Sequence, residues 1–238
     1  MMKRLAACLI TTGILISCSS SKNAGENNLS KMEKEQGYKL LFDGKTMNGW
    51  RTYQNKSAAS WAVDSGTLHC KGGNANYGAI TADLMTKDQY KNFDFEVDYK
   101  ISPKGNSGIL YLVTEDSSSS YLTGPEYQII DDVNFPEKLE AWQHTAANYA
   151  MNPAPDAQPN TAGEWNHARI VKNGNHVEHW LNGKKVVAYE LHSDEWNKNK
   201  MAEKFKDDAG YAAAEKGYIT FQNHGSEAWF KNIMIKEL

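Results

Sequence analysis

The 238-residue sequence predicts an all-β domain built as a two-sheet sandwich or a barrel. From about residue 37 onward, short runs of β-branched and aromatic residues recur, and Gly, Asn, Asp and Pro separate them. Many short strands with frequent turn signals are typical of such folds. The predicted strands are 39–42, 61–63, 67–70, 93–101, 108–114, 126–130, 165–172, 176–181, 185–191, 218–222 and 228–236.

Two local patterns support this prediction most clearly. Asn182-Gly183 stands between two extended runs, and Asn-Gly is the strongest short-range signal for a β-hairpin, here with strands at 176–181 and 184–189. Residues 93–99 alternate between apolar side chains and acids, which places the apolar side chains on one face of a strand. This strand is therefore expected to cover a core on one side only.

Two stretches interrupt the β pattern. Residues 134–163 contain four prolines and are too long for a simple connection, so they predict a long loop that either walls a binding site or is padding. Residues 193–207 predict one short helix, because Ser193 or Asp194 can cap it. The side chains at helical spacing are Trp196, Lys200, Met201, Lys204 and Phe205.

The amino terminus is typical of a bacterial lipoprotein signal. Lys3 and Arg4 precede a short apolar run, which ends in Leu15-Ile16-Ser17-Cys18. The run is too short to span a bilayer, and its end fits cleavage before Cys18 with acylation of the sulfur. We therefore expect a signal peptide at 1–17, a flexible lipidated tether at 18–36 and the folded domain at 37–238. An ordinary signal peptide with a chance cysteine is the alternative.

The predicted location is the cell envelope, with the lipid on Cys18 as the membrane partner. Ser19 follows Cys18, and by resemblance to Gram-negative lipoproteins this indicates the outer membrane, with the domain on its periplasmic side. Cys70 is then the only cysteine in the folded domain, so neither an internal disulfide nor a cysteine-rich zinc site can form.

Charge and composition narrow the range of binding partners that the sequence predicts. The net charge is −3 and the basic residues are scattered, so the electrostatic footprint of a nucleic-acid-binding protein is missing. Aromatic residues make up 11% of the chain, including seven tryptophans. Such side chains either stack on sugar rings or fill the core of a sandwich.

Polar residues within the predicted strand 126–130 mark a candidate site. Glu126 and Gln128 share one face there, roughly 7 Å apart along the chain. A carboxyl and an amide inside an apolar run are costly unless they meet a partner or a ligand, although a solvated face would also explain them. Asp131 and Asp132 follow at the strand end, either as metal or hydroxyl ligands or as turn formers.

Other polar residues suit the same face. Asn106 lies in a Gly-Asn-Ser-Gly segment, which is either a ligand-facing corner or a tight turn. Gln222 and His224 alternate at the end of a strand. His179 shares a face with Val177 and Leu181, and a histidine in that position is more often a core residue than a catalytic one.

Together these segments resemble the 3-keto-disaccharide hydrolase domain family across residues 37–238. The resemblance implies a concanavalin A-like jelly roll, a periplasmic or lipoprotein setting, and cleavage of glycosides oxidised at C3 of the sugar. The motifs that carry it are Leu41-Phe42-Asp43-Gly44-Lys45 with Gly49-Trp50, Gly105-Asn106-Ser107-Gly108, Gly124-Pro125-Glu126-Tyr127-Gln128, Glu164-Trp165-Asn166, Leu181-Asn182-Gly183, Gln222-x-His224-Gly225 and Phe230-Lys231-Asn232-Ile233.

The implied reaction needs a base near C2, a group that polarises the C3 oxygen and an acid for the leaving oxygen. Glu126 or His224 is the expected base, and His144 from the long loop is a candidate acid or metal ligand. A divalent metal ion stays open as a cofactor through Asp131, Asp132 or Glu126, although no ligand spacing here matches a recognised loop. The expected substrate-binding residues are Asn106, Gln128, Asp131, Trp165, His179 and Gln222.

Two other functions remain in view. A conventional retaining glycosidase needs two carboxyls about 5 to 5.5 Å apart, and the strand of Glu126 has Gln128 and Ile130 where a second one would stand. Glu178 or Asp131 could still supply it. A non-catalytic carbohydrate-binding lipoprotein is the other alternative, because jelly rolls serve lectins as readily as hydrolases.

Overall fold

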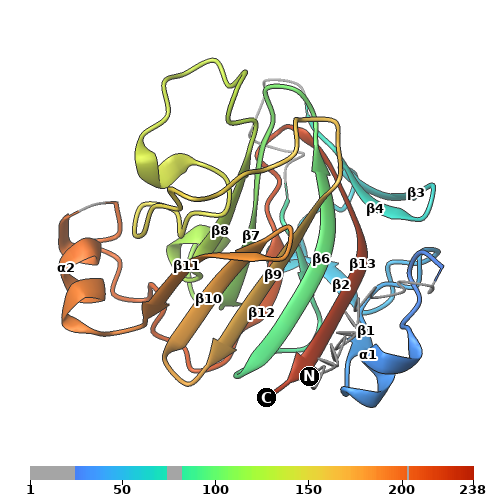
Figure 1. The fold of residues 1–238 in the computed structure, drawn as a ribbon, viewed down its shortest axis with the longest axis horizontal. Helices are drawn as coiled ribbons and strands as arrows, with labels where there is room; N and C mark the ends of the chain where they lie inside the picture. Colours follow the sequence, from blue (N-terminus) through green and yellow to red (C-terminus); the bar gives the residue numbers. More distant parts are fainter. Residues whose placement is uncertain (1–24, 74–81, 203) are drawn as a thin grey trace, which may run out of the picture.

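The computed structural model describes residues 25–73, 82–202 and 204–238, and they form two antiparallel sheets that pack face to face (Figure 1). The strands of the larger sheet are β1 (Lys39–Leu40), β3 (Trp61–Asp64), β4 (Thr67–Lys71), β6 (Phe93–Ile101), β9 (Asn166–Asn173), β10 (His176–Leu181), β11 (Lys184–Glu190) and β13 (Glu227–Glu237). Those of the smaller sheet are β2 (Trp50–Thr52), β5 (Leu84–Thr86), β7 (Asn106–Val113), β8 (Glu126–Ile130) and β12 (Tyr218–Phe221).

In both sheets, strands that are distant in the sequence lie next to each other. The larger sheet runs β11-β10-β9-β6-β13-β4-β3, with β1 paired to β13, and the smaller sheet runs β2-β5-β12-β7-β8. The core lies between the two sheets, where Phe95, Tyr111 and Phe221 are fully buried. The predicted all-β, two-sheet architecture is therefore confirmed. The sequence patterns did not reveal β2 and β5, which are three residues each.

Both local patterns have the predicted structure. β10 and β11 form a hairpin, and Asn182 and Gly183 take the positive φ angles, 49° and 84°, that its turn requires. In β6 the side chains of Phe93, Phe95 and Val97 are fully buried, and the acids between them point to the outer face. The alternation therefore separates a core face from a polar face.

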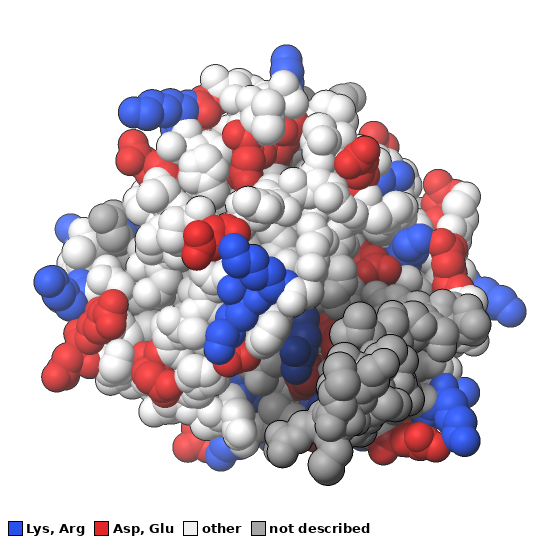
Figure 2. Space-filling view, viewed as in Figure 1, with Lys and Arg blue, Asp and Glu red and all other residues white. Residues whose placement is uncertain are grey.

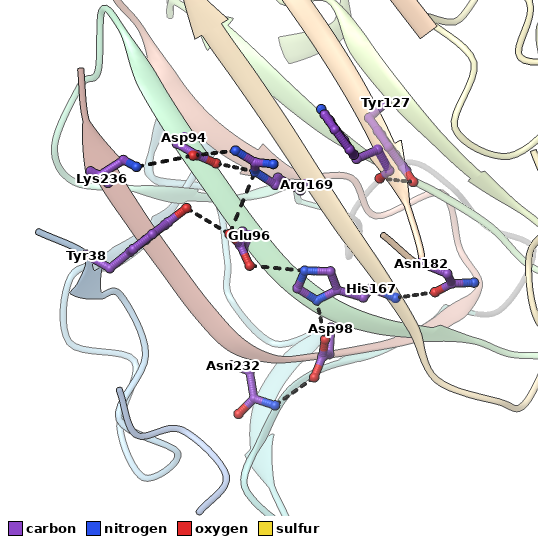
Figure 3. A network of polar contacts seen from close by, with 11 residues as sticks. Tyr38, Asp94, Glu96, Asp98, Tyr127, His167, Arg169, Asn182, Asn232 and Lys236 are labelled. Atoms are coloured by element: carbon purple, nitrogen blue, oxygen red, sulfur yellow. Dashed lines mark hydrogen bonds and ion pairs between the residues drawn. The ribbon is translucent and has the colours of Figure 1, made fainter. Parts of the chain in front are cut away.

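The acids of β6 form a network with basic side chains on the outer face of the larger sheet (Figure 3). Asp94 accepts two hydrogen bonds of 2.7 Å from Arg169. His167 lies between Asp98, at 2.7 Å, and Glu96, at 3.1 Å. Burial alone would lower the pKa of His167, but its hydrogen bonds to these two carboxylates outweigh burial and raise the pKa to about 9.

Most charges on this face are neutralised locally. Acidic and basic side chains intermix across the view in Figure 2, so no surface of a single sign covers the larger sheet. Lys185 lies 2.8 Å from Glu178, and Lys236 lies 3.5 Å from Asp94.

The predicted tether is wrong in its second half, because residues 25–36 are folded against the larger sheet. Asn27 and Asn232 hydrogen-bond reciprocally, each side-chain oxygen accepting from the other backbone N–H, at 2.7 and 3.0 Å. Helix α1 (Lys31–Glu35) follows, with a capping box formed by Ser30 and Glu33. Paired amides and a cap order this polar segment without an apolar pattern.

Residues 1–24, which include the predicted signal peptide and Cys18, lie outside the described residues. Among the helices that are described, none has the length and apolar character needed to cross a membrane. Cys70 is buried and free, as the cysteine count predicts.

The long loop 134–163 covers the outer edge of β8. Ala146 N–H donates to Gln128 O at 2.9 Å, Gln128 N–H donates to Ala147 O at 3.1 Å, and Tyr149 N–H donates to Glu126 O at 3.0 Å. An unpaired edge strand invites association, so the loop protects the sheet. It also holds a short 3-10 turn, η3 (Ala141–Gln143).

The predicted helix is present but shorter than expected. Helix α2 (Asp194–Ala202) begins after Ser193, whose hydroxyl accepts a hydrogen bond of 3.1 Å from Trp196 N–H. From Lys204 the chain turns back toward the smaller sheet, and this return brings Lys204 close to Tyr121 and Tyr149.

Candidate active site

The outer face of the smaller sheet carries the candidate site. Glu126 in β8 lies opposite Leu110 in β7, and Leu110 lies opposite Thr220 in β12. Residues directly opposite each other share a face of a sheet. Tyr127 and Phe221, which follow Glu126 and Thr220 along their strands, face the other way and are buried in the core. Glu126 therefore points away from the core.

Gly108 leaves room for the carboxyl of Glu126. In the next row Gln128 lies opposite Gly108, and Gln222 N–H donates to Gly108 O at 2.9 Å. A Cβ atom on Gly108 would lie 2.2 Å from Oε1 of Glu126. The carboxyl thus leans over Gly108 toward Gln222, and only glycine permits this position.

A pocket of about 320 Å³ opens on this face. Its walls come from η2 (Ser120–Leu122), from the end of β12, and from the segments that precede β5 and follow α2. The lining includes Asp83, Ser120, Tyr121, Lys204, Gln222 and His224.

Asp83 is a second carboxyl in the pocket. The hydroxyl of Ser120 donates a hydrogen bond to its Oδ2, and Asn223 N–H donates to its Oδ1 at 2.8 Å. Burial raises the pKa of Asp83 although these hydrogen bonds oppose the shift. Sequence reasoning missed this residue, because an isolated Asp before a three-residue strand carries no recognisable pattern.

Glu126 is a buried carboxyl near the pocket. Its side chain is 5% exposed, and no hydrogen bond from the described part of the chain reaches the carboxyl. Burial raises the pKa of Glu126 to about 8, with Lys204 opposing the shift and Asp83 adding to it. Glu126 therefore shares an electrostatic environment with two residues that line the pocket.

The long loop packs beside Glu126. The ammonium of Lys204 lies 4.5 Å from the ring of Tyr121 and 4.9 Å from the ring of Tyr149, which belongs to the loop. Tyr149 packs edge-on against Trp142 at 5.2 Å. The loop therefore packs against Lys204, which lines the pocket, but supplies none of the lining residues itself.

Five of the predicted site residues gather on this face. Gln222 and His224 line the pocket next to β12, and Glu126 and Gln128 stand on β8, with β7 between the two strands. Asn106 lies one step beyond Gly108 on the same face, and its side-chain oxygen is buried with no hydrogen-bond partner in the described residues. A buried amide oxygen of this kind is an acceptor whose hydrogen bond the described residues do not supply.

His179 does not belong to the site, so this prediction is wrong. The side chain is fully buried between the sheets. Its Nδ1–H donates to Ala146 O at 2.9 Å, and its Nε2 pairs with the hydroxyl of Tyr111 at 2.9 Å. Burial lowers the pKa of His179 to about 4, which keeps the ring neutral. It is a satisfied core histidine.

Asp131 and His144 also make their contacts outside the pocket. The Asp131 carboxylate accepts hydrogen bonds from the backbone N–H groups of Lys104, Val133 and Asn134, at 2.8 to 3.2 Å, so it is a turn former. His144 lies 3.3 Å from Asp132 beyond the far end of β8 and is not part of the pocket lining. Four residues of strand, about 13 Å, separate Glu126 from that end.

Trp165 and Glu178 lie on the outer face of the other sheet. The Lys231 ammonium lies 4.3 Å from the centre of the Trp165 ring, and Glu178 forms a salt bridge with Lys185. Trp165 is therefore no contact in this pocket, and neither Glu178 nor Asp131 is the second carboxyl beside Glu126. Among the described residues no group of three or more His, Cys, Asp or Glu side chains is placed to hold a metal ion.

The fold and the site define a class, namely two-sheet β-sandwich proteins with a carboxyl-containing pocket on one sheet. Residues 37–236 match the 3-keto-alpha-glucoside-1,2-lyase-like domain family, and the chain belongs to this family. It is similar to a 3-keto-disaccharide hydrolase of Bacteroides thetaiotaomicron, with 32% identity over 98% of this chain and 97% of the relative.

Solved structures agree with this assignment. A candidate glycosyl hydrolase from Parabacteroides distasonis is 38% identical over 90% of this chain and 100% of its own, with a TM-score of 0.84. A second one from the same organism is 26% identical over 84% and 99%, with a TM-score of 0.66. The family resemblance and the prediction of a glycoside-cleaving hydrolase are confirmed.

Proposed function

We propose that the protein cleaves 3-keto-glycosides by elimination across C1 and C2 of the oxidised sugar, followed by addition of water. One observation carries the proposal: the buried carboxyl of Glu126, which accepts no hydrogen bond from the described residues, stands near a pocket lined by another carboxyl, Asp83. Carboxyls with perturbed pKa values in a cleft are typical of acid–base catalysis. The name of the Bacteroides relative points to the same substrate class.

The chemistry of such a substrate matches this pair. A ketone at C3 makes the proton on C2 acidic, so a base can remove it. The electron pair of that C–H bond then forms the C1–C2 double bond, and the C1–O bond breaks. The leaving oxygen takes a proton from an acid, and water later adds across the double bond to complete the hydrolysis.

Glu126 is the proposed base and Asp83 the proposed acid. A pKa of about 8 makes the Glu126 carboxylate a stronger base than an ordinary one while part of it is ionised at neutral pH. Burial raises the pKa of Asp83, which favours this carboxyl as the group that gives a proton to the leaving oxygen. The amides of Gln128, Gln222 and Asn106 would position hydroxyl groups of the sugar.

Turnover by the purified domain tests the proposal. We expect release of sugar from a 3-keto-disaccharide and none from the unoxidised disaccharide. Glu126→Gln should lower kcat by at least about 100-fold, in line with the loss of a general base. Glu178→Gln is the matched control, because this carboxyl lies on the opposite sheet and should leave kcat unchanged.

Other outcomes identify the alternatives. Turnover of the unoxidised disaccharide would indicate a conventional glycosidase, and saturable binding without turnover would indicate a carbohydrate-binding lipoprotein. Repeating the assay with a chelator decides whether a divalent metal ion is required.

We propose further that the protein acts in the bacterial envelope, anchored through a lipid on Cys18 and facing the periplasm from the outer membrane. The support is the sequence alone, with Lys3 and Arg4 before an apolar run that ends at Cys18. Metabolic labelling with a fatty-acid analogue should mark the wild-type protein in the membrane fraction. Cys18→Ser should abolish the label, and a label that persists would contradict the anchor.

A further inference from the structure

Three basic side chains converge on the pocket. Lys56, Lys204 and His224 all line it, although the protein as a whole carries a net charge of −3. In the described part of the chain, none of the three forms a salt bridge. A cluster of basic groups at one opening focuses a positive potential there.

Several basic side chains elsewhere in the molecule have acidic partners. On the larger sheet Arg169 pairs with Asp94, and Lys185 pairs with Glu178. At the edge of the smaller sheet Arg51 lies 2.6 Å from Glu115. Among the described residues Lys56, Lys204 and His224 form no salt bridge, although Asp83 interacts electrostatically with Lys56 and His224, and Glu126 with Lys204.

Aromatic rings hold both lysines at the pocket. The Lys204 ammonium lies over the rings of Tyr121 and Tyr149, and the Lys56 ammonium lies 5.6 Å from the ring of Tyr53. Cation–π contacts restrain an ammonium without neutralising its charge. Both ammonium groups are thus held at the pocket lining, where a ligand can contact them.

Asp83 in the pocket and Glu126 near it offset only part of this charge. Burial raises the pKa of Glu126 to about 8 and shifts that of Asp83 in the same direction, so at neutral pH Glu126 is largely uncharged. A raised pKa lowers the negative charge that a carboxyl carries, so the positive charge of the two lysines exceeds the negative charge of the two carboxyls. An uncharged sugar would leave this excess of positive charge without a partner.

We propose that the substrate carries an anionic group, a carboxylate or a sulfate, which binds to Lys56, Lys204 and His224. This inference rests on the proposed cleavage of 3-keto-glycosides in the same pocket. It goes further by stating that the glycoside is charged, either on the departing group or on the oxidised sugar. Ammonium groups bind oxyanions through charge-assisted hydrogen bonds.

Two pairs of substrates test the inference. The first pair is the 3-keto-glucoside of 3-carboxy-4-nitrophenol and its methyl ester, which places the charge on the departing group. The second pair is 4-nitrophenyl 3-keto-glucoside 6-sulfate and its unsulfated parent, which places the charge on the sugar. For each pair, kcat/KM is measured at low and at high ionic strength.

We expect the anionic member of at least one pair to have the higher kcat/KM, with an advantage that shrinks as salt is added. Lys56→Gln and Lys204→Gln should each lower the ratio of anionic to neutral kcat/KM by about three- to tenfold. Lys100→Gln is the matched control, because this lysine lies over Trp229 on the opposite sheet. It should leave the ratio as in the wild type.

Three results would overturn the inference, and they are distinguishable. Equal kcat/KM for both members of both pairs would show that the pocket does not select charge. Equal losses for anionic and neutral substrates in the lysine variants would show that the lysines stabilise negative charge formed in the reaction. No turnover of any of the four compounds would instead contradict the proposed function itself.

Discussion

Replacing Glu126 with glutamine should stabilise the protein, and the gain should grow with pH. In the folded protein burial raises the pKa of this carboxyl from 4.5 to about 8. Between these values the folded protein binds more protons than the unfolded chain, so the free energy of unfolding falls as the pH rises. The difference between the two pKa values corresponds to about 5 kcal/mol, which is the upper limit of the effect.

Urea denaturation followed by tryptophan fluorescence at pH 5, 7 and 9 measures this directly. Glutamine cannot ionise, so the free energy of unfolding of Glu126→Gln should exceed that of the wild type by more at pH 9 than at pH 5. Glu137→Gln, which changes an exposed carboxyl in the long loop, is the control. A gain from Glu126→Gln that is independent of pH, or that falls with pH, would refute the assignment of a buried, proton-holding carboxyl.

Three further substitutions test neighbouring parts of the account. Gly108→Ala places a Cβ where the Glu126 carboxyl now lies, so kcat should fall at least about tenfold with little change in Tm; unchanged kcat would be inconsistent with the described position of the carboxyl. The pKa of His167 is raised from 6.5 to about 9, so its stabilising effect is fully present below pH 6.5 and is lost as the pH rises through 9. In urea denaturation, His167→Gln should lower the free energy of unfolding by up to about 3 kcal/mol at pH 6 and by little at pH 9.5. Equal losses at the two pH values would contradict the network. The pKa of His179 is lowered from 6.5 to about 4, so the wild type should lose stability as the pH falls across that range. The Tm of His179→Gln should fall less than the wild-type Tm between pH 6.5 and pH 4. Equal falls in Tm would indicate a solvated ring.

Sequence patterns predicted the parts of the fold that depend on neighbouring residues. The alternation around Phe95 and the Asn182-Gly183 turn are local features, and both have the expected structure. The face shared by Glu126 and Gln128 also follows from the period of a strand, and register then adds Gln222 to it.

Other parts depend on contacts between distant segments, which no local pattern reveals. Asp83 reaches the pocket because a short strand pairs with β12, and Lys204 reaches it because the chain turns back after α2. His179 has a polar side chain but lies between the sheets, where a backbone carbonyl and the Tyr111 hydroxyl satisfy it. Trp165 belongs to one of the motifs that resemble the family, but it lies on the larger sheet, away from the pocket.

Deuterium at C2 of the substrate tests the proposed chemistry most directly. A 3-keto-disaccharide labelled with deuterium at C2 is incubated with the purified protein in ordinary water, and the released sugar is analysed by mass spectrometry. If Glu126 removes the C2 proton, the released keto-sugar loses its deuterium and the reaction slows relative to the unlabelled compound. Full retention of deuterium in the released sugar would show that the C2–H bond stays intact, and elimination in this pocket would be ruled out.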